Sequence, residues 1–230
     1  MSDSRSIGNV AKSERAKLEQ FARDDPLWPG QLAMLAAIAL NFALPERLTV
    51  GPTWVLPSIE GVVLLALVVA TRLHPTRSPR RHALTVVLML LVTGAYLGSE
   101  YLLVHYLLGG GKAGGRALIL SGVVLWLTNV LLFAVWYWLL DRGGPLPSEH
   151  TDVRPDFQFP HMTDEVRGLY SDWSPNFVDY LYVALTNASA FSPTDTMPLS
   201  RWTKVTMGVQ ATAALVTVGV IFARAVNILA

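Results

Sequence analysis

The sequence predicts an all-α integral membrane protein, with five transmembrane helices and one re-entrant or interfacial half-helix before the last span. The chain of 230 residues is 52% hydrophobic, with a mean hydropathy of +0.39. Only 15% of its residues are charged, against about 25% in ordinary globular domains. The apolar excess is gathered in long uninterrupted runs, which is typical of membrane spans.

Five apolar segments predict the spans, because roughly 20 helical residues cross a hydrocarbon core about 30 Å thick. They lie at about 28–44, 53–71, 83–108, 117–140 and 203–229. Tryptophans occur near segment ends, as in the aromatic belts of membrane proteins: Trp28, Trp136, Trp138, Trp173 and Trp202. The division is a polar tail, residues 1–26, and a single transmembrane domain, residues 27–230.

The one long connection, residues 141–201, precedes the last span. Its first part is polar and proline-rich, so a loop is expected there. The following apolar stretch is too short to span a membrane and predicts a half-helix at about 175–187. Ser174 and Pro175 are expected to begin that helix as its N-cap and first residue. Asp195 or Thr196, followed by Pro198, is expected to begin the last helix.

Basic residues predict the topology. Five spans place fourteen Lys and Arg residues on the side of the N-terminus and three on the other side. Because cytoplasmic loops are enriched in Lys and Arg, the N-terminus and the 141–201 connection are expected in the cytoplasm. A bacterial inner membrane is the expected location.

The stretch LTNASAFSPTDTMPLSR, residues 185–201, and the helices around it resemble the pore domain of two-span potassium channels. The resemblance implies that residues 187–191 occupy the filter positions, where backbone carbonyls replace the water around the ion. Ser189 and Phe191 stand where the filter has glycines, which permit its unusual backbone angles. The filter would also face the cytoplasm. A selective potassium channel is therefore not expected.

Another pattern covers Asp179, Leu181, Tyr182, Phe191 and Asp195. In these residues the chain resembles a family of small five-span bacterial membrane proteins described only as a domain of unknown function. The resemblance implies a shared fold around this loop and no particular activity.

The loop itself is rich in oxygen atoms. It offers either a polar cup for an ion or small polar solute, or a set of helix caps with a wedged phenylalanine. The candidate residues of this pore-like loop are Thr186, Asn187, Ser189, Phe191, Ser192, Asp195 and Thr196.

Ionisable residues inside the spans form a second candidate site, an intramembrane charge layer of Glu60, Glu100, His105 and Arg224. Because successive spans cross the membrane in opposite directions, these residues are expected at similar depth. Charges at such depth usually pair or line a wet cavity. The layer is therefore either a polar, proton-sensitive pathway or a structural network in which Arg224 pairs with Glu60 or Glu100.

Two functions remain open at this stage. The first is a channel-like or transport-like protein for an ion or small polar solute, and the second is a non-conducting structural, sensing or assembly subunit with a pore-like fold. The expected partners are the lipid bilayer and, through the close-packing motif Gly94–Gly98, another helix of the chain or a second copy in a homo-oligomer. Neither a nucleic-acid partner, an enzymatic activity, a cofactor nor a metal site is expected, because the net charge is +1 and no catalytic or ligand motif is present.

Overall fold

The structure is a computed structural model that describes residues 27–49, 51–73, 79–109, 115–144, 154–170, 173–189 and 196–229. The side chains of 70–73, 79–82, 115, 116, 143 and 224–229 lie outside this description.

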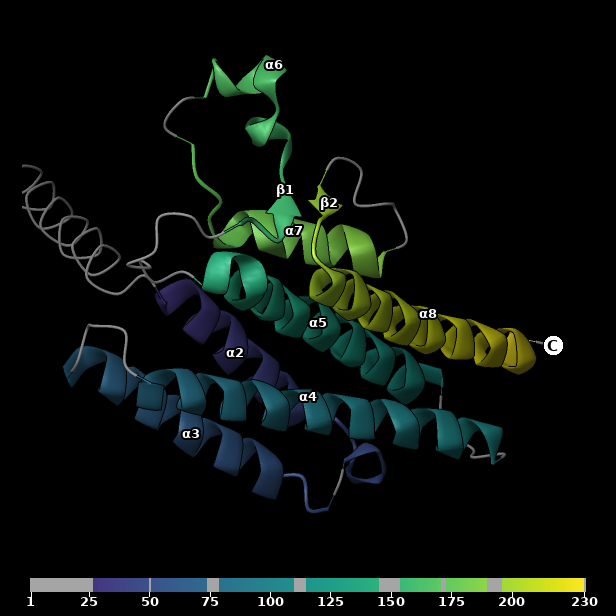
Figure 1. Cartoon of the computed structure of the whole chain (residues 1–230). Helices are drawn as coiled ribbons and strands as arrows, with labels where there is room; N and C mark the ends of the chain where they lie inside the picture. The colour runs from purple at the N-terminus through teal and green to yellow at the C-terminus, as the bar shows by residue number, and fades with distance from the viewer. Residues whose placement is uncertain are drawn as a thin grey trace, which may run out of the picture.

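Among the described residues, five long helices run side by side (Figure 1). They are α2 (Trp28–Asn41), α3 (Val55–Leu73), α4 (Pro79–Leu108), α5 (Gly115–Leu140) and α8 (Arg201–Leu229). A short 3-10 helix, η1 (Glu46–Leu48), lies between α2 and α3. The central helix is α5, which packs against α2, α4 and α8 and against the shorter α7 (Phe177–Ala188).

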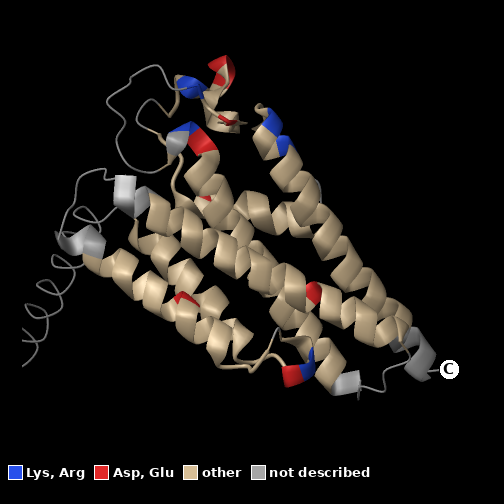
Figure 2. Cartoon of the chain, turned by 60° about the horizontal axis from the view of Figure 1, so that its bottom comes forward, with Lys and Arg blue, Asp and Glu red and all other residues tan. Residues whose placement is uncertain are grey.

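Within the part of the chain that the structure describes, three helical segments are long and apolar enough to cross a membrane: Ala83–Leu108, Ala117–Leu140 and Arg201–Ala223. The all-helical class and the membrane character are therefore confirmed. The apolar helices at the first two expected spans are shorter than these three segments. Helix α2 has 14 residues, and the apolar part of α3 is Val55–Val69. Lys, Arg, Asp and Glu residues gather towards the ends of the bundle, and the stretches of helix between these ends contain few of them (Figure 2).

Close contacts fix the direction of neighbouring helices. Gly30 of α2 lies against Trp138 of α5, where an added Cβ atom would be 2.4 Å from the indole Cζ3. The Trp136 indole N–H donates to the Thr93 hydroxyl of α4 at 3.0 Å. The start of α2 and the middle of α4 therefore both lie beside the last turns of α5. Gly94, by contrast, has open space where a side chain would be, so no helix of the described chain packs closely there.

The long connection is more ordered than the expected loop. After α5 come two 3-10 helices, η2 (Asp141–Gly143) and η3 (Pro160–Met162), and the short helix α6 (Asp164–Arg167). Strand β1 (Phe157–Gln158) pairs antiparallel with β2 (Met197–Pro198), and Phe157 lies opposite Pro198. Phe157 and Phe159 are buried against Tyr180 of α7, so aromatic packing holds this segment onto the bundle.

Two helix starts differ from the expectation. The N-cap of α7 is Asn176, whose side-chain Oδ1 accepts from the Val178 N–H at 2.8 Å, while the Asp179 carboxylate accepts from the Asn176 N–H at 2.8 Å. This reciprocal capping box satisfies two helix-end donors, which Ser174 with Pro175 does not do. At α8, the Ser200 hydroxyl accepts from the Thr203 N–H at 3.2 Å. The last helix therefore begins at Arg201, after Ser200 rather than after Thr196; Asp195 lies outside the described residues.

Candidate functional site

Helix α7 lies along the second half of α5. At its start, the Phe177 ring packs edge-on against Trp138, with ring centroids 5.4 Å apart. At its end, the Trp126 indole N–H donates to the Ala188 carbonyl at 3.3 Å. Trp126 and Trp138 are separated by about 18 Å of helix, so α7 runs antiparallel to α5 and ends near the middle of it.

Where α7 ends, three polar side chains meet between α5, α7 and α8. The Gln210 Oε1 atom accepts from Asn187 Nδ2 at 2.8 Å and also from the Tyr137 hydroxyl. The Gln210 amide N–H donates to the Ala184 carbonyl of α7 at 2.8 Å. Asn187 Nδ2 also lies 3.0 Å from the Met207 carbonyl of α8. Both ends of the Gln210 amide thus hold α7 against its neighbours.

The polar contacts continue through the bundle towards α4. Asn129 Nδ2 donates to the Tyr96 hydroxyl at 2.9 Å and lies 3.3 Å from the Gln210 carbonyl. One turn beyond Tyr96, the Glu100 carboxylate oxygens lie 2.8 and 2.7 Å from the Thr217 hydroxyl, which also lies beside the Tyr96 hydroxyl. We call this continuous set of side chains the polar seam: Asn187, Tyr137, Gln210, Asn129, Tyr96, Thr217 and Glu100.

The polar seam is closely packed. Tyr96, Asn129, Tyr137 and Gln210 have no exposed surface, Thr217 and Glu100 are buried, and Asn187 is half-buried. Neighbouring residues bond to each other directly, Asn129 through the backbone carbonyl of Gln210, and the Asn129 Oδ1 atom has no partner within the described residues. Direct bonds between buried groups satisfy polar atoms that would otherwise be costly in an apolar interior.

The described residues of the pore-like loop do not gather into a cup. The Thr186 hydroxyl donates back to the Tyr182 carbonyl at 2.9 Å, and the Ser189 hydroxyl donates back to the Leu185 carbonyl at 2.8 Å. Thr196 is buried, at 8% exposure, beside the start of β2. Only Asn187 among them joins the polar seam; Phe191, Ser192 and Asp195 lie outside the described residues.

Two residues of the expected charge layer are buried carboxyls with neutral partners. Glu60 of α3 accepts from Asn41 Nδ2 at 3.3 Å, and Glu100 is bonded to Thr217. Gly30 of α2 lies beside Trp138 of α5, and the distance along α2 from Gly30 to Asn41 places Glu60, the partner of Asn41, near the middle of α5. Thr93 of α4 lies beside Trp136 of α5, and the distance along α4 from Thr93 places Glu100 at a similar level. The Arg224 side chain lies outside the described residues, so the expected ion pair stays a prediction.

His105 does not belong to this buried layer. Its ring is exposed and stacks on Tyr101, with ring centroids 5.8 Å apart. His105 follows Glu100 by five residues, which is about 140° around the helix axis. The sequence-based expectation used only the depth of each residue in the membrane and did not consider the direction in which its side chain leaves the helix.

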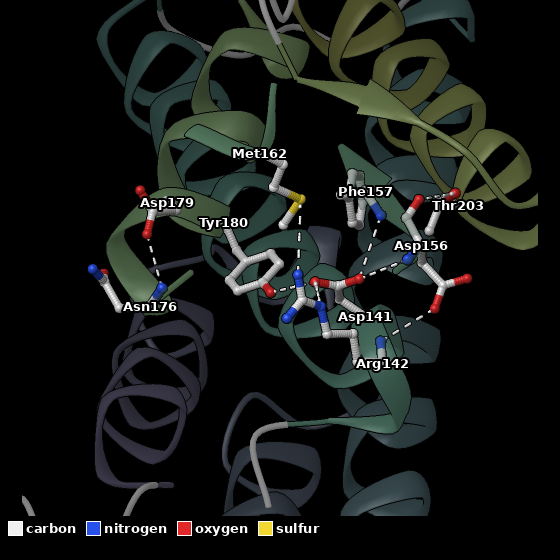
Figure 3. Close-up of polar contacts among 9 residues, drawn as sticks. All are labelled: Asp141, Arg142, Asp156, Phe157, Met162, Asn176, Asp179, Tyr180 and Thr203. Atoms are coloured by element: carbon white, nitrogen blue, oxygen red, sulfur yellow. Dashed lines mark hydrogen bonds and ion pairs between the residues drawn. The ribbon is translucent and has the colours of Figure 1, made fainter. Parts of the chain in front are cut away.

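Asp141 organises the end of the bundle beyond the polar seam (Figure 3). Its Oδ1 atom accepts from the backbone N–H groups of Asp156, at 2.7 Å, and Phe157, at 3.3 Å. Its Oδ2 atom accepts from the Tyr180 hydroxyl at 2.6 Å, and the Arg142 Nε atom lies 3.9 Å from it. This buried carboxylate therefore joins α5, β1 and α7.

Burial, and then the hydrogen bond to Asp141, raise the pKa of the Tyr180 hydroxyl above its ordinary value. The phenol thus keeps the proton that it donates. The stabilisation is complete below the ordinary tyrosine pKa of about 10 and is lost only as the pH rises through the raised value.

Sequence reasoning missed most of the polar seam and Asp141. A signal was present, since Asn129, Gln210 and Thr217 are polar residues inside long apolar segments, where polar groups must find internal partners. Within the described residues, no three His, Asp or Glu side chains are grouped so that they could hold a metal ion. No family model, curated protein or solved structure matches the chain.

Proposed function

We propose that the protein is a non-conducting integral membrane protein, a sensing or assembly subunit in which α7 is a structural half-helix. The observation that carries this proposal is the packing of the polar seam. Its residues bond directly to each other and all but the half-buried Asn187 are buried, so they leave no hydrated path between the end of α7 and Glu100. An ion crossing here would have to break this network.

In this proposal the chain has five spans in a bacterial inner membrane, with its N-terminus in the cytoplasm. Support for the two shorter spans comes from their outward faces. Leu32 and Leu35 of α2 are exposed, as are Val62 and Leu65 of α3. Exposed aliphatic side chains on every long helix suit contact with lipid rather than water. Helix α7 would enter from the cytoplasmic side and end at mid-depth.

The end of α7 argues against a potassium filter. Such a filter needs backbone carbonyls aimed at a shared axis. The Asn187 side chain instead turns into its own bundle, and the Ala188 carbonyl is bonded by Trp126. Both groups are committed to contacts within the chain.

Transport of an ion or small polar solute is the second candidate function. Two buried carboxyls, Glu60 and Glu100, lie at a similar level and have neutral partners. Ionisable residues inside membrane helices often mark ion or proton pathways. This candidate requires the bundle to open, because the described arrangement is closed.

A flux assay separates the two functions. Purified protein reconstituted in liposomes should pass potassium, sodium and protons no faster than protein-free liposomes of the same lipid. An ionophore added at the end shows that the ion gradients were intact. A protein-dependent flux of any of the three ions would refute the non-conducting proposal, and its loss in Glu60→Gln or Glu100→Gln would establish the transport candidate.

A further inference from the structure

Glu60 is a buried carboxyl outside the polar seam. It lies on the inner face of α3, has no exposed surface, and accepts one hydrogen bond, from Asn41. Its second oxygen, Oε1, is buried and has no partner within the described residues.

A third polar group shares this level. The Thr128 hydroxyl of α5 is also buried without a partner in the described part of the chain. Thr128 precedes Val135 by seven residues, so both are on the same face of α5. Val135 lines a cavity of about 30 Å³ between α2, α3, α4 and α5, which places Thr128 on the face of α5 turned towards these three helices.

Among the described side chains, the two helices packed against α3, α2 and α4, offer Glu60 no cation. Helix α2 contains no titratable residue, and residues 83–108 of α4 contain no Lys or Arg. The titratable groups in that part of α4 are Tyr96, Glu100, Tyr101, His105 and Tyr106. Tyr96 and Glu100 belong to the polar seam, His105 and Tyr101 are exposed, and Tyr106 accepts from Arg47 at 3.1 Å. In α5, residues 117–140 contain Tyr137 as their one titratable group, and it bonds to Gln210.

An ionised carboxylate in this position would lose its hydration and gain a single amide hydrogen bond. Such burial is unfavourable without a paired cation or several donors. The protonated form avoids the cost, because a neutral carboxyl needs far less solvation. Asn41 can still donate to its carbonyl oxygen, and the acid proton stays on the other oxygen.

We propose that Glu60 is a proton-binding site, separate from the polar seam, which keeps its proton at neutral pH in the folded protein. The proton is held by the apolar packing of α3 against α2 and α4 rather than by a network of donors. Release of the proton requires α2 and α3 to separate, so proton binding is coupled to the packing of these two helices. This inference does not depend on whether the protein conducts.

Infrared spectroscopy of the purified protein tests the proposal directly. At neutral pH, the stretching band of a protonated carboxyl should be present in the wild type and should lose intensity in Glu60→Gln. Glu46→Gln, which changes an exposed acid in η1, is the matched control and should leave the band unchanged. In Asn41→Ala the same band should move to higher frequency, because the carbonyl loses its hydrogen bond. A spectrum unaltered by both Glu60→Gln and Asn41→Ala would overturn the proposal.

Thermal stability gives a second readout. A folded protein that keeps a proton which its unfolded chain releases loses stability as the pH rises. Glu60→Gln should therefore melt at or above the wild-type temperature at neutral pH, and its advantage should grow towards alkaline pH. If Glu60→Gln instead melts below the wild type, by a difference that grows with pH, proton binding is contradicted. Stabilisation of the wild type by sodium but not potassium, absent in Glu60→Gln, would instead identify a sodium site and overturn the proposal.

Discussion

Replacing Gln210 with leucine is expected to destabilise the protein by about 3 kcal/mol, because it leaves several buried groups without partners. Leucine has a similar volume but cannot accept from Asn187 and Tyr137 or donate to the Ala184 carbonyl. Unfolding in mixed detergent micelles, followed by circular dichroism, measures the change.

The matched control for Gln210→Leu is Thr212→Leu, a polar-to-leucine change on the exposed face of the same helix. The Thr212 hydroxyl bonds only to the Gly208 carbonyl within its own helix, so little change is expected. Equal stability of Gln210→Leu and the wild type would show that the polar seam does not hold α7 in place.

Replacing Asp141 with alanine is expected to cost about 3–5 kcal/mol, the largest effect of any single substitution proposed for this chain. The change strands the Tyr180 hydroxyl and the N–H groups of Asp156 and Phe157 in a buried position. Thermal melting in detergent should show the loss.

A graded series makes the Asp141 prediction specific. Asp141→Asn retains an acceptor for the backbone N–H groups, so it should cost less than Asp141→Ala. Tyr180→Phe removes one of the three donors and should cost about 1 kcal/mol. Asp164→Ala removes an exposed acid from α6 and should be neutral. An Asp141→Ala protein as stable as Asp164→Ala would mean that the carboxylate does not join the connection to the bundle.

The helices themselves could be predicted from the sequence, because each one is determined locally by the position and length of an apolar run. The half-helix at 175–187 was close to the observed Phe177–Ala188 for the same reason. Its start was wrong because Ser174 and Asn176 are both good caps, and the choice depends on Asp179 reaching back to the Asn176 N–H.

The polar contacts could not be predicted in the same way. Asn187 and Gln210 are 23 residues apart, and Glu100 and Thr217 are 117 apart. Which of the polar residues in different helices meet depends on helix rotation and on the level at which neighbours pack. Only the depth of each residue in the membrane could be inferred from the sequence, and this was enough to predict that Glu60 and Glu100 lie at a similar level. Rotation was needed as well to recognise that His105 points away.

Solvent accessibility of the polar seam shows whether water or ions can pass through the bundle. The chain has no natural cysteine, so single cysteines can be introduced without a background. In proteoliposomes, Thr217→Cys and Ala184→Cys should resist a small water-soluble thiol reagent added on both sides, because Thr217 belongs to the polar seam, Ala184 lies beside it, and both positions are buried. Glu165→Cys, in the exposed part of α6, should react fully. Modification of Thr217→Cys and Ala184→Cys at rates close to that of Glu165→Cys would show a hydrated path through the bundle and contradict the account.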